Sequence, residues 1–313
     1  MSVAFLFPGQ GAQDPGFLHR LPECAEVAST LREAGAALGC DVGALDAADA
    51  LASTVAAQLT IVTAGVAVAR ALAARGAGPD AVAGLSVGAF AAAVAAGALE
   101  LRDALPLVRL RGELMERAYP RGHGMAAIVG LDERTVSGIV EAARGPGAPL
   151  DVANVNAPAQ IVIAGADPAI DAALERARAA GARRVERMAV AVPSHSPLLA
   201  EVSARLLEAI RCVPMARPRV PYATSRRARL TRDEDVIRED LARNVAEVVR
   251  WHDATTALYE TGARLLVEMP PGHALSALAA AAFPGARAIA AAETRLDTIV
   301  ALVRRERALD AGR

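Results

Sequence analysis

The chain has 313 residues, of which 53% are hydrophobic and 22% are charged, and its formal net charge at pH 7 is −1. These values are typical of a compact enzyme of one large or two modest domains and give no reason to expect a nucleic acid or a membrane as partner. All 34 cationic side chains are arginine, which excludes Schiff-base chemistry and a catalytic lysine. Three cysteines without paired spacing favour a reducing, cytoplasmic setting and no metal site.

The N-terminal third begins with an apolar run, Val3 to Phe7, which is expected to be a buried strand. No basic segment precedes this run, so it does not resemble a signal peptide. A glycine-rich loop follows at 8–13, and helices are expected over 23–39 and 55–75. Charged residues and glycines interrupt the alanine-rich stretches, so no convincing span of about 20 apolar residues is expected.

A pentapeptide, Gly84 to Gly88 (GLSVG), stands between a short apolar run at 80–83 and a helix-favouring run at 89–96. A serine between glycines on a strand-to-helix turn is typical of a nucleophile elbow, where the hydroxyl is exposed near the positive end of a helix. Ser86 is therefore the candidate nucleophile. The alternative is a glycine-lined helix start that Ser86 merely caps.

The middle of the chain has its own pattern of strands and helices. Strands are expected at 125–130, 151–156, 160–165 and 183–190, and helices at 133–144 and 167–180, the second capped by Asp167 and followed by Gly181. The order βαββαβ is that of a ferredoxin-like unit. We therefore expect a ferredoxin-like subdomain over 123–190, inserted into an α/β-hydrolase-like core made of 1–122 and 191–313.

The rest of that core alternates helices with strands. Helices are expected at 101–118, 196–211, 233–262 and from 274, and strands at 265–269 and 287–290. Strands separated by helices favour a mostly parallel sheet with helices on both faces.

A serine nucleophile needs a base, and five histidines could supply it. His195 is the best candidate because it lies between two prolines in a loop that follows the last strand of the small unit. His123 and His273 are flanked by glycines and are weaker alternatives. His19 and His252 have charged, helix-like neighbours and are expected to be solvated.

The motifs together resemble malonyl-CoA:acyl carrier protein acyltransferases. The resemblance starts with Phe7 to Gln13 (FPGQGAQ) and the GLSVG elbow, and continues through Arg111 to Met115 and Asn156 to Gly165. It ends with Val192 to His195 (VPSH) and Glu268 to Gly272. These matches run in family order from residue 5 to about 285, and six weak motifs in order are a specific signal.

The resemblance implies a role for each matching residue. Ser86 would accept the acyl group, His195 would act as its base and then as an acid, and Arg111 would hold the malonyl carboxylate. Gln10 and the Val87 N–H would stabilise the oxyanion, and the carbonyl of Arg250 would orient His195. The same motifs would place further residues around the pocket, namely Gln13, Leu85, Met115, Asn156 and Gln160. Malonyl-CoA would be the substrate, with no bound cofactor.

The sequence departs from the family in three places. Leu85 replaces the histidine of the usual GHSxG elbow, Ala89 stands where glutamate is common, and Arg250 replaces a glutamine before Trp251. With these departures and the segment from Ala118 to Ile128, the chain is most similar to the epsilon subunit of malonate decarboxylase within the family. That branch implies a small carrier subunit with a CoA-derived thiol prosthetic group as partner, and further decarboxylase subunits.

Three alternatives stay open. The chain could be the housekeeping transacylase of fatty-acid or polyketide synthesis, a serine thioesterase or hydrolase, or a subunit that has lost activity. The carboxylate-binding arginine argues against the hydrolase, because a hydrolase does not need a clamp for the acyl group's free carboxylate. The sequence leaves the docking surface and the oligomeric state open.

Overall fold

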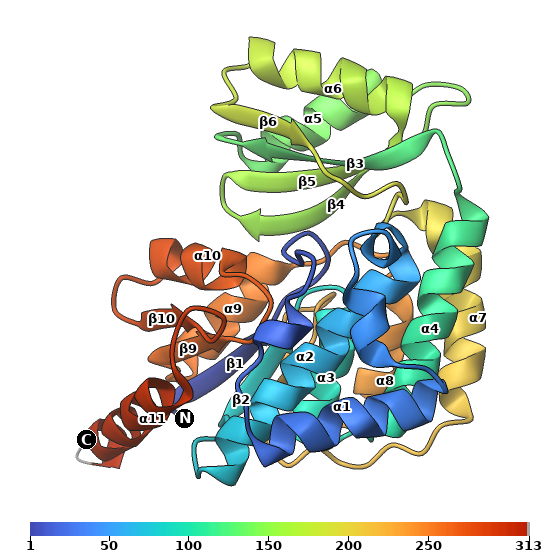
Figure 1. Ribbon diagram of the computed structural model, residues 1–313. Coiled ribbons are helices and arrows are strands. Elements are labelled where there is room, and N and C mark those ends of the chain that lie inside the picture. The colour runs from blue at the N-terminus through green and yellow to red at the C-terminus, as the bar shows by residue number, and fades with distance from the viewer. Residues whose placement is uncertain (312–313) are drawn as a thin grey trace.

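The computed structural model describes residues 1–311 and contains two β-sheets, each accompanied by helices (Figure 1). The larger sheet has six strands in the order β10-β9-β1-β2-β7-β8, and the smaller has four in the order β4-β5-β3-β6. The strands of the larger sheet are β1 Val3–Phe7, β2 Ala81–Gly84, β7 Tyr222–Ala223, β8 Leu230–Thr231, β9 Leu265–Glu268 and β10 Arg287–Ala290. Those of the smaller sheet are β3 His123–Val129, β4 Leu150–Ala157, β5 Gln160–Ala166 and β6 Arg184–Arg187.

The helices alternate with the strands along the chain. They are α1 Ala25–Leu38, α2 Thr54–Ala74, α3 Gly88–Ala96, α4 Leu101–Ala118, α5 Glu133–Ala143, α6 Asp167–Ala179, α7 Ala200–Arg211, α8 Glu234–Arg243, α9 Trp251–Glu260, α10 Ala274–Ala282 and α11 Leu296–Ala311. Short 3₁₀ turns cover Leu18–Arg20, Val42–Asp46, Ala50–Ala52 and Pro197–Leu199. The fold is mixed α/β, and the expected helix over 101–118 is confirmed.

Strand β1 lies in the middle of the larger sheet. All five of its residues are fully buried, and it pairs in parallel with β2 on one side and β9 on the other. In this register Phe7 is opposite Gly84, so β1 and β2 end side by side. The loop after β1 and the turn containing Ser86 therefore emerge at the same edge of the sheet, where sites form in parallel α/β folds.

The smaller sheet is antiparallel, and its elements follow the order β3-α5-β4-β5-α6-β6. Its edge strand β4 contacts the large unit, because Val155 N donates to Val249 O at 2.9 Å and Val249 N donates to Ala153 O at 2.9 Å. This contact fixes the small sheet above the carboxyl edge of the larger one (Figure 1).

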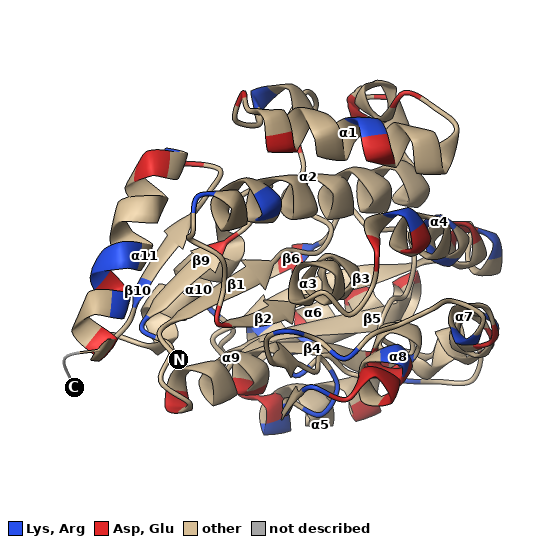
Figure 2. Ribbon diagram, turned by 90° about the horizontal axis from the view of Figure 1, so that it is seen from below, with Lys and Arg blue, Asp and Glu red and all other residues tan. Residues whose placement is uncertain are grey.

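Helix α2 belongs to the main hydrophobic core. It is long and apolar enough to span a membrane, with a mean hydropathy of 1.7, so the expectation of no such stretch is wrong. However, 89% of the window concerned is buried inside the protein. Figure 2 shows α2 between α1 and the larger sheet, with most of the charges on the outer helices. Its apolar surface therefore packs against neighbouring elements on nearly every side.

Several expected elements differ from those observed. The helix expected over 233–262 is two helices, α8 and α9, because the intervening backbone makes hydrogen bonds to distant segments: Asn244 and Val245 accept from His195, and Val249 bonds to β4. Asp167 does not cap α6, since its carboxylate pairs with Arg187 instead. The final strand of the small sheet spans four residues, and β7, β8 and α11 were not expected.

Candidate active site

The turn at Ser86 has the geometry of a nucleophile elbow. Ser86 has a φ of 55°, a left-handed conformation that is strained for a residue with a side chain. A Cβ at Gly84 would lie 2.3 Å from Ala89 N, and one at Gly88 would lie 2.3 Å from Phe7 O. Only glycine fits at these two positions, so the turn itself requires both glycines of the pentapeptide.

Ser86 and His195 lie within hydrogen-bond distance, as expected from the sequence. His195 Nε2 is 2.9 Å from Ser86 Oγ, and Nδ1 contacts the main-chain carbonyl of Asn244. His195 N also donates to Val245 O at 2.7 Å. Because Nδ1 faces a carbonyl, it carries the proton, which leaves Nε2 free to accept the serine proton.

The expected role of Arg250 is wrong. The carbonyl that faces His195 belongs to Asn244, which ends helix α8, whereas the carbonyl of Arg250 accepts from Ala254 N at the start of α9. The Arg250 side chain pairs with Glu133 at 2.6 Å and Asp253 at 2.8 Å. The last carbonyls of a helix have no partner within it, so Asn244 is free to accept from an imidazole.

Arg111 is fully buried beside the serine. Its Nη2 donates to Ser86 Oγ at 3.1 Å, while Nε and Nη1 have no partner among the described residues. Burial lowers the pKa of the guanidinium to about 9. A buried cation with two free donors is costly unless a ligand supplies an anion. An anionic group bound beside Ser86 would supply the partner that these donors lack among the described residues.

His195 is held in its neutral form. Burial, and secondarily the charge of Arg111, lower its pKa to about 3. At neutral pH the imidazole is consequently unprotonated and able to take a proton.

The cavity at Ser86 is small, about 70 Å³. Its walls are Gly9, Gln10, Leu85, Ser86, Met125, Asn154, Asn156, Val162, Met188, Val190, Ser194 and His195. The buried Oδ1 atoms of Asn154 and Asn156 have no partner among the described residues, so they can bind a ligand's donors. Asn154 was missed from the sequence, although its position two residues before Asn156 on one strand was a usable signal.

A second cavity of about 410 Å³ shares Gln10 and Met125 with the first, and Gln13 and His123 also line it. Of the other expected pocket residues, Met115 is buried in the core, where it contacts Gln58, and Gln160 does not line the Ser86 cavity. The pocket roles of Met115 and Gln160 stay predictions; Met115 contacts Gln58, which binds Gln10, and Gln160 opens β5 at the hairpin.

The expected oxyanion donors lie at the carboxyl edge of the larger sheet, where Ser86 also lies. Val87 follows the nucleophile at the N-cap position of α3, and Gln10 lines the Ser86 cavity. The Gln10 side chain accepts from Gln58 Nε2 at 2.9 Å, which fixes the loop after β1. Donation to an oxyanion by either group stays a prediction.

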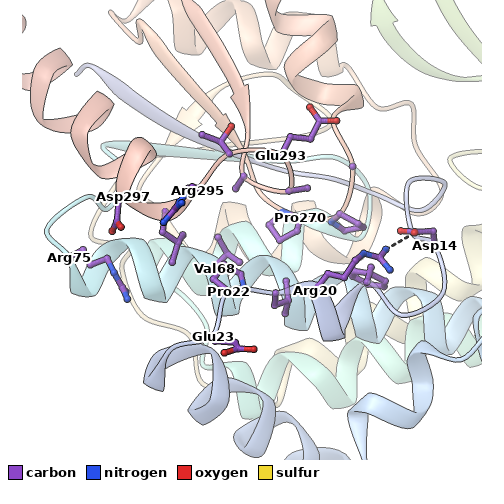
Figure 3. A pocket seen from close by; sticks show the side chains of 18 residues that line it. Asp14, Arg20, Pro22, Glu23, Val68, Arg75, Pro270, Glu293, Arg295 and Asp297 are labelled. Carbon is purple, nitrogen blue, oxygen red and sulfur yellow. Dashed lines mark hydrogen bonds and ion pairs between the residues drawn. The ribbon is translucent and has the colours of Figure 1, made fainter.

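A larger cavity of about 560 Å³ lies at the carboxyl ends of β9 and β10 (Figure 3). Its rim carries charges of both signs, including the Arg20–Asp14 pair at 2.5 Å. Neither Ser86 nor His195 lines it. Among the histidines of the described residues, only His195 makes a hydrogen bond with Ser86, whereas His273 pairs with Glu293 and His252 stacks on Phe283.

A serine–histidine pair at a strand-to-helix turn of a mixed α/β fold is the arrangement of acyl-transfer enzymes. The acyl transferase domain family matches residues 4–309. The chain therefore belongs to the acyl transferase family and is an acyltransferase.

Named relatives cover most of the chain. The malonyl CoA-acyl carrier protein transacylase of Escherichia coli K12 is 35% identical over 281 residues, which cover 88% of this chain and 91% of the relative. The acyl-carrier-protein S-malonyltransferase of Burkholderia pseudomallei has 37% identity and a TM-score of 0.91, covering 96% of this chain and 100% of that one. A malonyl-transacylase solved in complex with a type II polyketide acyl carrier protein has 32% identity and a TM-score of 0.91, with the same coverages.

Proposed function

We propose that this protein transfers the malonyl group of malonyl-CoA to the thiol of an acyl carrier protein. The observation that carries the proposal is the buried Arg111 guanidinium, whose Nε and Nη1 have no partner among residues 1–311 and whose Nη2 lies 3.1 Å from Ser86 Oγ. A planar guanidinium binds a carboxylate through two parallel hydrogen bonds, and malonyl carries a carboxylate close to its thioester carbonyl. The names of the relatives support the same substrate and partner.

The proposed reaction has two half-reactions at one serine. Ser86 Oγ attacks the thioester carbonyl carbon while His195 Nε2 takes its proton, and the CoA sulfur then leaves with that proton as the malonyl-serine ester forms. In the second half, His195 accepts the proton of the carrier thiol, whose sulfur attacks the ester. The proton returns to Ser86 as the carrier thioester is released.

Val87 N–H and Gln10 would stabilise the oxyanion of both tetrahedral intermediates, a contribution of about 3–4 kcal/mol per donor in comparable sites. The small volume of the cavity, about 70 Å³, favours a thiol on a long arm over bulk water as acceptor. The 410 Å³ cavity that shares Gln10 with it is the proposed entrance for that arm.

Intact mass spectrometry tests the proposed function. Wild-type protein mixed with malonyl-CoA should gain one malonyl group and lose it when a carrier protein is added. Ser86→Ala should gain none. Absence of an adduct on the wild type would instead support a subunit that has lost activity.

A serine thioesterase is the alternative that the fold also permits. It would release free malonate at the same rate with and without carrier protein, whereas a transferase would release it slowly in both cases. Measuring free malonate in the two reactions therefore separates the two functions.

The carrier that we propose is the thiol-bearing subunit of malonate decarboxylase, on the grounds of Leu85 in the elbow and the other sequence departures. The alternative carrier is that of fatty-acid or polyketide synthesis, which the names of the relatives favour. Transfer rates to the two kinds of carrier, measured side by side, decide between them. A faster rate on the fatty-acid carrier would overturn the decarboxylase assignment.

We also propose that residues 123–190 form a ferredoxin-like subdomain and that 1–122 with 191–313 form an α/β-hydrolase-like core. The strand order β4-β5-β3-β6 supports the ferredoxin-like subdomain.

A cytoplasmic location is proposed because Cys24, Cys40 and Cys212 are all free thiols.

A further inference from the structure

Asp240 is a buried carboxylate to which the reaction above assigns no role. It is 2% exposed and lies on α8, one turn before Asn244. It accepts three hydrogen bonds, from Tyr222 Oη at 2.9 Å, Ser225 N at 2.9 Å and Arg226 N at 3.2 Å. A buried carboxylate is expensive to desolvate, so three converging donors indicate a position that the fold holds in place.

One set of contacts links Asp240 to the nucleophile. Ser225, whose backbone N–H the carboxylate binds, donates through Oγ to Gly84 O at 3.1 Å. Gly84 is the last residue of β2 and the first of the elbow that presents Ser86. Tyr222 belongs to β7, which pairs directly with β2 through Val82.

A second set links Asp240 to the base. Asn244 N donates to the main-chain carbonyl of Asp240 at 3.0 Å, which completes the last turn of α8. The carbonyl of Asn244 then contacts His195 Nδ1, and that of Val245 accepts from His195 N. The two groups that hold the imidazole, the carbonyls of Asn244 and Val245, therefore directly follow the helix that carries Asp240.

We propose that Asp240 is a positioning residue that holds the serine turn and the histidine-binding end of α8 at a fixed separation. Ser86 and His195 come from segments far apart in the chain, and their 2.9 Å hydrogen bond depends on both supports. The carboxylate joins these supports through Ser225 on one side and α8 on the other. Asp240 does not line the Ser86 cavity, so it acts without contacting the substrate.

This inference rests on the proposed Ser86–His195 chemistry, and its test is designed to separate the two. Asp240→Asn keeps the size of the side chain but replaces one acceptor oxygen with an N–H₂ that faces other donors. Tyr222→Phe and Ser225→Ala each remove a single hydroxyl and serve where the first variant is too unstable. Asp46→Asn is the matched control, since Asp46 is 1% exposed and accepts from Leu18 N, but does not line the Ser86 cavity.

The readouts are single-turnover malonylation of Ser86, kcat and KM for malonyl-CoA, and the folded fraction by urea unfolding. We expect Asp240→Asn to lower kcat about 10- to 100-fold with KM changed less than about twofold, because displacement of one reacting group by about 1 Å costs this much. Ser225→Ala should lower kcat in the same direction. Asp46→Asn should lower stability but leave kcat per folded molecule unchanged.

A double-mutant cycle gives the decisive comparison. If Asp240 acts through Ser225, combining Asp240→Asn with Ser225→Ala should cost less than the product of the single effects. Unchanged kcat per folded molecule in Asp240→Asn, or a rise in KM alone, would overturn the inference. Malonyl transfer that survives in Ser86→Ala would instead overturn the proposed function, whatever Asp240 does.

Discussion

Arg111 and His195 share one electrostatic environment. Both are buried, and the charge of Arg111 contributes to the low pKa of His195, about 3. A carboxylate bound to Arg111 would neutralise that charge and make the imidazole a stronger base. A malonyl substrate would thus raise the basicity of the group that must deprotonate Ser86, whereas an acetyl substrate would not.

Replacing Arg111 should change acyl selectivity. Arg111→Ala removes the only guanidinium that faces Ser86 in the described residues, so malonyl transfer should fall at least about 100-fold, in line with the loss of a buried charged hydrogen-bond pair. Acetyl transfer should stay the same or rise. Steady-state rates with malonyl-CoA and acetyl-CoA measure this, and equal losses on both substrates would show that Arg111 is only structural.

The pH dependence of acylation should reflect the low pKa of His195. The imidazole is neutral above a pH of about 3, so protonation of His195 should not reduce acylation between pH 8 and pH 5. In Arg111→Ala the lost cation no longer disfavours imidazolium, so the pKa of His195 should rise and the acid limb should shift to higher pH. Stopped-flow acylation with acetyl-CoA measures the acid limb of the wild type and that of Arg111→Ala. An acid limb near pH 6.5 in the wild type would contradict the low pKa of His195.

At the scale of elements, the elbow is fixed by close contacts between backbones. Gly88→Ala would place a Cβ 2.3 Å from Phe7 O and 2.5 Å from Pro8 O, both in backbone that cannot move without disturbing β1. We expect at least about 3 kcal/mol of lost stability, as for severe overpacking, and a matching loss of activity. Urea unfolding and acylation rates measure these effects.

Gly138→Ala is the control for this substitution. Gly138 lies inside α5, and a Cβ there would meet no atom within 4 Å. Alanine in a helix interior should raise stability by about 0.5–1 kcal/mol without affecting acylation. If both glycine variants behaved alike, the close contacts at the elbow would not be the cause.

Local sequence predicted most elements well, because their apolar periodicity and their turns are local properties. The expected helix 101–118 and the strands next to Ser86 depend on such signals. The break between α8 and α9 could not be predicted, since Asn244 to Val249 look helical and depart from a helix only because β4 and His195 bind their backbone groups. The assignment of the histidine partner to Arg250 failed for the same reason.

At the scale of the whole molecule, the larger sheet is assembled from both ends of the chain. Strand β1 lies between β2 and β9, and β9 comes from the C-terminal part of the chain, so it is synthesised long after β1. A chain that stops at Gly262 would leave one edge of a fully buried apolar strand unpaired. We expect this chain to aggregate, and a chain that stops at Thr294, which keeps β9 and β10, to be more soluble. Soluble yield and size-exclusion profiles measure the difference.

Helix α2 has a consequence for how the protein is made in the cell. Its apolar surface is buried only when the larger sheet and the surrounding helices have formed. Of these elements, β9 and α11 lie in the C-terminal part of the chain. During translation, α2 leaves the ribosome before β9 and α11 have been synthesised. A long apolar stretch in an unfinished chain is a binding site for a holdase chaperone and a possible signal for membrane targeting. The apolar face of α2, which is almost wholly buried in the finished enzyme, is therefore exposed while the chain is being made.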